Sequence, residues 1–143
     1  MASAEIYNKA LDLLSRREHS RKELYLKLTK RFHLKEDINL SLDRLEEKNL
    51  LNDSRFAEEY VQARRNKGFG PNKISAELEK RGVNESLISN EIDKFKDWEY
   101  LAELSFKKRF PDGVSKDFQR LQKQKNFLLN KGFTFYQIES VLD

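Results

Sequence analysis

Three sets of apolar residues recur in this chain at one fixed interval of fifty residues. They comprise Leu28, Leu78 and Leu128; Ile38, Ile88 and Ile138; and Leu42, Ile92 and Leu142. Basic residues share this interval, since Arg31, Arg81 and Lys131 each lie three residues after the leucine of the first set. A long period with apolar residues in register is typical of a supersecondary unit that is used more than once. We therefore expect one small unit repeated three times, with its function on an extended surface.

Composition limits what each repeat can bury. Hydrophobic residues make up 38% of the 143 residues and charged residues 36%, so each unit has a thin core and gains stability from its neighbours. The net charge of +4 permits an anionic partner without requiring one. The chain contains no Cys, which excludes disulfides and suits a reducing cytoplasm. Met1–Ile6 does not resemble a signal peptide, and no apolar run approaches the roughly 20 residues of a membrane span.

Residues typical of helix boundaries divide each repeat into three short helices. Capping boxes are predicted at Ser20 with Glu23 and at Thr134 with Gln137, helix caps at Asp53 and Asn84, a first helical position at Pro71, and helix ends at Gly68, Gly82 and Gly132. The third repeat starts near Trp98, breaks at 111–113 and resumes from Ser115. We expect nine helices and no sheet, divided into repeats 1–51, 52–96 and 97–143.

The sequence offers little for catalysis. The two histidines, His19 and His33, flank helix boundaries, where we expect both to be solvated, and no pattern of zinc ligands is present. Gly68 and Gly70 are not part of a phosphate loop, because the following Pro71 lacks an amide donor. Adjacent carboxylates such as Glu58 and Glu59 point in different directions on a helix and favour a solvated face. We predict no catalytic residue, no metal and no cofactor.

Basic residues gather at corresponding places in the three repeats. Seven Lys or Arg lie in 16–31 against two acids, four lie in 64–73 with no acid, and seven lie in 107–125 against two acids. If equivalent helices line one side of a regular array, these clusters form a cationic stripe suited to phosphates or to an acidic protein groove. The alternative is that the charges only keep a helical protein soluble. Nearby aromatic residues, including Tyr60, Phe69 and Trp98, are predicted to pack in the core.

Several segments resemble the RecX family, whose members regulate the bacterial recombinase RecA. The central motif comprises residues 52–61, residues 64–71, Ile74, Glu77, Leu78 and residues 81–83. The first repeat is similar to the family at Ala10, Leu13, Leu14, Arg17, Ser20, Arg21, Glu23 and Leu24, and the third at Phe127, Leu128, Gly132, Phe133, Ile138, Val141 and Leu142. Asn52 stands where the family commonly has an acid, and we expect Asp53 to cap that helix instead.

The resemblance implies a fold and a function. The fold is all-α, with three tandem three-helix repeats in an elongated, curved, right-angled helical array. The implied function is inhibition of the RecA filament on single-stranded DNA: the protein lies in the filament groove, blocks extension or promotes disassembly, and so damps strand exchange and LexA cleavage. The implied protein is a cytoplasmic monomer whose affinity for single-stranded DNA is weak, salt-sensitive and indifferent to sequence.

The predicted RecA or DNA contacts are basic residues from all three clusters: Arg16, Arg17, Arg21, Arg64, Arg65, Lys67, Lys73, Arg81, Lys107, Lys108 and Lys123. One alternative is a sequence-specific helix-turn-helix regulator, which would discriminate its duplex site by about 10³ or more. Another is a protein-only scaffold without salt-dependent DNA affinity. An enzyme, such as a metal-dependent nuclease, is the remote alternative.

Overall fold

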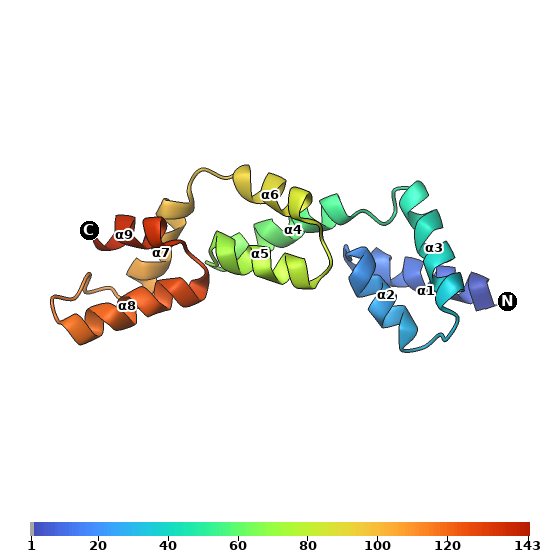
Figure 1. Ribbon diagram of the computed structural model, residues 1–143, viewed down its shortest axis with the longest axis horizontal. Coiled ribbons are helices and arrows are strands. Elements are labelled where there is room, and N and C mark those ends of the chain that lie inside the picture. Colours follow the sequence, from blue (N-terminus) through green and yellow to red (C-terminus); the bar gives the residue numbers. More distant parts are fainter. Residues whose placement is uncertain (1) are drawn as a thin grey trace. The chain divides into compact units, whose positions relative to one another are not determined.

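A computed structural model describes residues 2–143, and within that range the chain forms nine helices and no strand (Figure 1). They are α1 (Ala2–Arg16), α2 (Arg21–Thr29), α3 (Lys35–Glu47), α4 (Asp53–Asn66), α5 (Pro71–Lys80), α6 (Glu85–Asp93), α7 (Trp98–Arg109), α8 (Phe118–Lys131) and α9 (Phe135–Leu142). The predicted all-α fold is confirmed.

The helices form two compact units. The first unit comprises the chain up to Glu59 together with Leu78–Ile88, and the second comprises Tyr60–Glu77 together with Ser89–Asp143. Each of α4, α5 and α6 therefore contributes one part to each unit. The predicted boundaries after residues 51 and 96 come from the sequence repeat, whereas these two units are defined by compactness. The predicted boundaries therefore stay a prediction.

Local capping sets the starts of three helices as predicted. Ser20 and Glu23 form a complete capping box before α2, and Thr134 and Gln137 form another before α9. The Oδ1 atom of Asn84 accepts a hydrogen bond from the amide of Leu87 at 2.9 Å and so caps α6. Such caps satisfy amide groups that have no partner within the helix.

Two predicted helix starts were wrong. Asn52, not Asp53, caps α4, because its Oδ1 accepts a hydrogen bond from the amide of Arg55 at 3.0 Å. The carboxylate of Asp53 instead accepts the amide of Arg21 at 2.8 Å and so caps the first residue of α2. The helix expected from Ser115 begins at Phe118, since Asp117 provides its side-chain cap.

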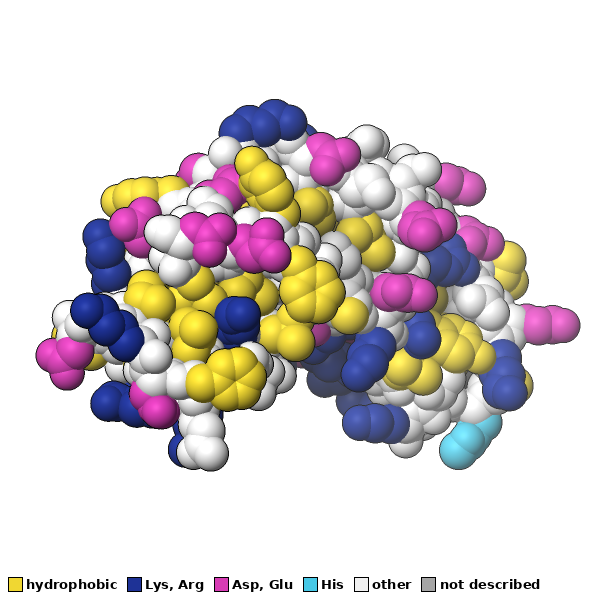
Figure 2. Space-filling model, turned by 60° about the vertical axis from the view of Figure 1, so that its left-hand side comes forward, with side chains coloured by type: hydrophobic (Ala, Val, Ile, Leu, Met, Phe, Trp, Pro, Cys, Tyr) yellow, Lys and Arg dark blue, Asp and Glu magenta, His cyan; other side chains and the backbone are white. Residues whose placement is uncertain are grey.

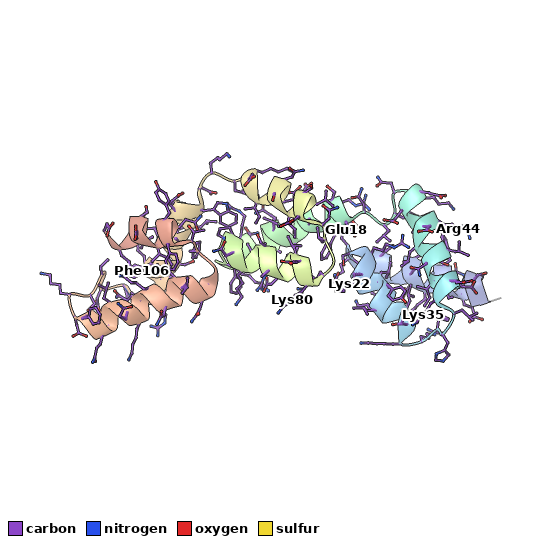
Figure 3. The ribbon with its side chains drawn as sticks, viewed as in Figure 1. Glu18, Lys22, Lys35, Arg44, Lys80 and Phe106 are labelled. Carbon is purple, nitrogen blue, oxygen red and sulfur yellow. The ribbon has the colours of Figure 1, made fainter. Side chains whose placement is uncertain are left out.

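The core of the first unit includes the three residues of the first repeat that carry the fifty-residue register, Leu28, Ile38 and Leu42. Its buried members are Ile6, Ala10, Leu24, Leu28, Ile38, Leu42, Leu45 and Leu51. Burying each large aliphatic side chain stabilises the fold by about 1.5–3 kcal/mol relative to exposure. Arg44, labelled in Figure 3, covers one edge of this core with its guanidinium 4.8 Å from the ring centroid of Tyr7.

Aromatic packing joins α7 to α8 in the second unit. Phe106, labelled in Figure 3, is buried and lies 5.1 Å, between ring centroids, from Phe110. The ring of Phe110 in turn meets Phe127 of α8 edge-on at 5.4 Å. Phe133 is fully buried, as predicted for the residue after the glycine that ends α8.

The loop before α5 is bound to the end of α8 by two backbone hydrogen bonds. The amide of Gly70 donates to the carbonyl of Lys131 at 2.7 Å, and the amide of Asn72 donates to the carbonyl of Gly132 at 2.8 Å. Gly132 has φ +100°, and a Cβ atom there would overlap the backbone nitrogen and Cβ of Lys73. Only glycine permits this approach, which places the end of α8 beside residues 67–73.

We expect Gly132→Ala to destabilise the protein by more than Gly113→Ala does. Gly113 also has a positive φ, +89°, but a Cβ atom there meets nothing within 4 Å. Gly113→Ala therefore measures backbone strain alone, about 1–2 kcal/mol, while Gly132→Ala adds the steric overlap. Urea unfolding followed by circular dichroism measures both values, and equal losses would contradict the close approach.

His19 corrects a second expectation, because its side chain is buried while that of His33 is exposed. Its Nδ1 lies 3.0 Å from the carbonyl oxygen of Arg17, and its Nε2 lies 2.8 Å from Nζ of Lys27. A carbonyl only accepts and an ammonium only donates, so the neutral ring carries its proton on Nδ1. Burial, together with the charges of Arg17 and Lys27, lowers the pKa of His19.

Stability should therefore fall as the pH drops from 7 to 5. The unfolded His19 takes up a proton near its ordinary pKa of about 6.5, whereas the folded ring resists protonation down to a lower pH. The stability that the neutral His19 contributes is fully present above the unfolded pKa and is lost progressively as the pH falls below it. His19→Gln replaces the imidazole with a neutral amide that does not titrate. Chemical denaturation at a series of pH values should then show a smaller change in stability between pH 7 and 5. An unchanged slope would exclude His19 as its origin.

Candidate cationic binding surface

The described part of the chain, residues 2–143, contains no group of three or more His, Cys, Asp or Glu side chains placed to hold a metal ion. No helix within it is long and apolar enough to cross a membrane. The predicted basic residues form the candidate site, and the structure divides them between the two compact units.

Four predicted contact residues lie in the first unit, and each pairs with a carboxylate. Arg16 contacts Asp12 at 2.9 Å, and Arg17 contacts Glu23 at 3.2 Å. Glu23 also lies 3.4 Å from Arg81. Arg21 contacts Asp43 at 2.7 Å and also pairs with Glu46. The Arg16 pair lies within α1, whereas the pairs of Arg21 and Arg81 join separate segments of the first unit.

Two further contacts join the loop before α2 to segments that follow the first repeat. Ser20 Oγ donates to the carbonyl of Arg81 at 2.7 Å, and Arg55 pairs with Glu18, which is labelled in Figure 3. The pKa of Asp53 is raised by burial, although the hydrogen bond from the Arg21 amide opposes this effect. Hydrogen bonds to the backbone and ion pairs therefore both stabilise the start of α2.

Arg64 is the first of two arginines at the end of α4 whose side chains have structural partners. Its Nε and Nη2 donate to the two carboxylate oxygens of Glu77 at 2.9 and 2.7 Å. Burial alone would raise the pKa of Glu77, but hydrogen bonds from Arg64 and Tyr60 outweigh it and lower the pKa. The guanidinium also lies 3.9 Å from the ring centroid of Phe69, a cation–π arrangement.

Arg65 is buried, with an exposed fraction of 8%. Its Nη2 donates to both oxygens of Asp97, at 2.8 and 3.0 Å. The guanidinium lies 3.8 Å from the ring centroid of Phe95 and 4.6 Å from that of Trp98. Arg65 therefore binds the end of α4 to the start of α7, and Trp98 packs as predicted.

The predicted lysines are more accessible than these arginines. Lys67, Lys108 and Lys123 are exposed and, among the described residues, none of them lies within ion-pair distance of a carboxylate. Lys73 is half-buried beside Phe69, and Lys107 pairs with Glu103 at 2.8 Å. Figure 2 brings the C-terminal part of the chain forward and shows Lys and Arg side chains among a broad group of hydrophobic ones.

Lys67 and Lys108 come together at a cavity of ≈480 Å³ within the second unit. We call it the cationic cavity; its lining residues are Arg65, Asn66, Lys67, Gly68, Leu101, Leu104, Ser105, Lys108, Arg109, Phe127 and Lys131. Lys123 lines a neighbouring hollow beside Arg120. Arg109 and Lys131 were missing from the predicted set, although Lys131 shares the fifty-residue register of Arg31 and Arg81.

Comparison with known proteins agrees with this architecture. Family models described as the first, second and third three-helix domains of RecX match residues 7–45, 52–90 and 97–142. A "Regulatory protein RecX" of Halorhodospira halophila is 38% identical over 97% of this chain and 87% of its own length. One of Chromohalobacter salexigens is 38% identical over 93% of this chain and 88% of its own length.

Solved structures show the same fold. A crystal structure of RecX from Lactobacillus salivarius has a TM-score of 0.84 and 26% identity, covering 97% of this chain and 93% of the other. A second structure, described as regulatory protein RecX, has a TM-score of 0.83 and 26% identity, covering 97% and 70%.

The fold and these matches define the class, a regulatory protein made of three tandem three-helix domains. The chain belongs to the RecX family. The predicted membership is confirmed, and a regulatory rather than an enzymatic role accords with it.

We expect Arg65→Glu to destabilise the protein by about 3–5 kcal/mol, because it would leave Asp97 facing a second carboxylate beside two aromatic rings. Lys67→Glu, two residues away, should change the free energy of unfolding by less than about 0.5 kcal/mol, since its side chain is exposed. Urea denaturation of both variants tests this difference. Equal stability would show that the buried ion pair contributes nothing.

Proposed function

We propose that the protein inhibits RecA by binding along the groove of its filament on single-stranded DNA. Binding there blocks filament extension or promotes disassembly, and so damps strand exchange and LexA cleavage in the cytoplasm. Membership in the RecX family supports the regulatory role. The observation that carries the proposed contact is the exposure of Lys67, Lys108 and Lys123 without carboxylate partners among the described residues.

These lysines suit a polyanionic partner for a physical reason. An arginine that already forms an ion pair must lose that pair before it binds a new anion, whereas an exposed, unpaired ammonium exchanges only water and counterions. The lysines can therefore contact DNA phosphates or acidic surface on RecA at little cost to the fold. Each phosphate contact on a single strand adds roughly 0.7 to the salt dependence of the binding constant, on logarithmic axes.

Binding measurements separate this function from the alternatives. Weak affinity that falls with salt and ignores base sequence supports the proposal. Discrimination of one duplex site by about 10³ would favour a helix-turn-helix regulator instead. Absence of any salt-dependent DNA affinity, combined with binding to RecA alone, would favour a protein-only scaffold. Sedimentation tests the proposed monomer.

Reversing the three exposed lysines should weaken RecA inhibition. The variant Lys67→Glu, Lys108→Glu, Lys123→Glu should need about tenfold more protein for half-inhibition, since three exposed charges contribute roughly 0.5 kcal/mol each. The readout is the DNA-dependent ATPase of RecA, with helicity checked by circular dichroism.

The matched control reverses three other exposed lysines, Lys35, Lys96 and Lys116, which lie outside the predicted contact set. It has the same net charge, so it reports the effect of charge alone. Equal loss of inhibition in both variants would contradict a localised contact surface, and no inhibition by the natural sequence would contradict the proposed function.

A further inference from the structure

The cationic cavity is basic on one side and apolar on another. Five of its eleven lining residues are Lys or Arg, and none is acidic. Its remaining wall includes Leu101, Leu104 and the ring of Phe127, and Leu104 has an exposed fraction of 45%. Its volume of ≈480 Å³ lies within the range of roughly 300–1,000 Å³ typical of small-molecule sites.

The cavity walls are held in place by hydrogen bonds that do not involve the charged side-chain groups. Ser105 Oγ donates to the carbonyl of Gly68 at 3.0 Å and so joins α7 to the turn after α4. The Gly70 amide bond to the Lys131 carbonyl joins the same turn to α8. Because three helices are tied together here, Lys67, Lys108 and Lys131 face one space that exists before any ligand binds.

Helix dipoles do not account for so much positive charge. Arg65, Arg109 and Lys131 lie in the last turns of α4, α7 and α8, where cations offset the helix C-terminus. Each helix end carries about half a negative charge. Three helix ends and Asp97 together leave roughly two to three of the five positive charges without compensation.

Arg65 supplies an independent indication of a missing acceptor. Its Nε and Nη1 are buried and have no hydrogen-bond partner among the described residues, although Nη2 is bound to Asp97. Stacking on Phe95 and Trp98 stabilises the charge but accepts no hydrogen bond in the guanidinium plane. Buried donors without acceptors are uncommon in folded proteins because their desolvation is costly. Because Nε and Nη1 have almost no exposed surface, an anion in the cavity that Arg65 lines would offset this cost through its charge rather than by accepting their hydrogen bonds.

We propose that the cationic cavity binds a phosphate-bearing nucleotide. Its phosphoryl groups would lie among Lys67, Lys108, Arg109 and Lys131, and its base would pack on Leu104 and Phe127. Two or three phosphoryl charges match the roughly two to three uncompensated positive charges. The same chemistry is available from a free nucleoside diphosphate or from a terminal nucleotide of a single strand. The site shares Lys67 and Lys108 with the surface proposed to contact the RecA filament, so it deepens that proposal, but its test requires no RecA.

The test measures binding to the full chain without RecA, by calorimetry and by fluorescence of Trp98, the only Trp in the sequence. ADP, adenosine, inorganic pyrophosphate and a short oligothymidylate are titrated separately. We expect ADP to bind more tightly than adenosine or pyrophosphate, because it uses both walls. Tighter binding of the oligothymidylate than of ADP would support the same site and identify a strand as the source of the nucleotide.

Two variants locate the binding. Lys108→Glu removes one phosphate contact and should weaken ADP or oligothymidylate binding by about tenfold or more. Leu104→Trp fills the apolar side without changing charge and should weaken nucleotides more than pyrophosphate in calorimetry. Lys116→Glu, which is exposed and outside the cavity, should have no effect beyond that of net charge.

Equal affinities for all three variants and the natural sequence, or no binding of any probe, would overturn the site. Circular dichroism checks that each variant is folded. Failure here would leave RecA inhibition by the natural sequence intact, whereas absence of RecA inhibition with nucleotide binding retained would contradict the proposed function alone.

Discussion

The buried guanidinium of Arg65 is the interaction on which the second unit depends. It lies against Phe95 and Trp98 and pairs with Asp97, so one side chain at the end of α4 fixes the segment that leads into α7. An arginine can do this because its planar group stacks on rings while its edge donates hydrogen bonds. A lysine at this position would keep the charge but lose the stacking and the paired donors.

Arginine and lysine have different roles in this chain for the same reason. Arg21, Arg55, Arg64 and Arg65 pair with carboxylates from other helices or connecting segments. These contacts combine charge with directed hydrogen bonds, which survive partial burial better than a point charge does. The exposed lysines contribute little to the fold and remain accessible to an external anion. A basic cluster in sequence is therefore a mixture of structural and available charges.

The sequence predicted local features well and tertiary features poorly. Ser20 with Glu23 and Thr134 with Gln137 formed the predicted capping boxes, because each depends only on residues three places apart. Asp53 was misassigned because it caps α2, a helix that lies 32 residues earlier in the sequence. His19 and Arg65 were expected at the surface, since no local pattern reveals that Lys27 or Trp98 will cover them. The cationic cavity could not be predicted from the sequence, because it depends on how the turn after α4 contacts α7 and α8.

The basic position of the fifty-residue register has a different role in each repeat. Arg31, Arg81 and Lys131 occupy the same position, yet they have different surroundings. Arg31 is exposed, with its guanidinium 5.5 Å from the ring centroid of Phe32, and Arg81 lies 3.4 Å from Glu23. Lys131 has no carboxylate within ion-pair distance in the described chain and instead lines the cationic cavity. Repetition conserves the helix and the basic end, while the neighbouring carboxylate decides whether that charge stabilises the fold or stays available for a ligand.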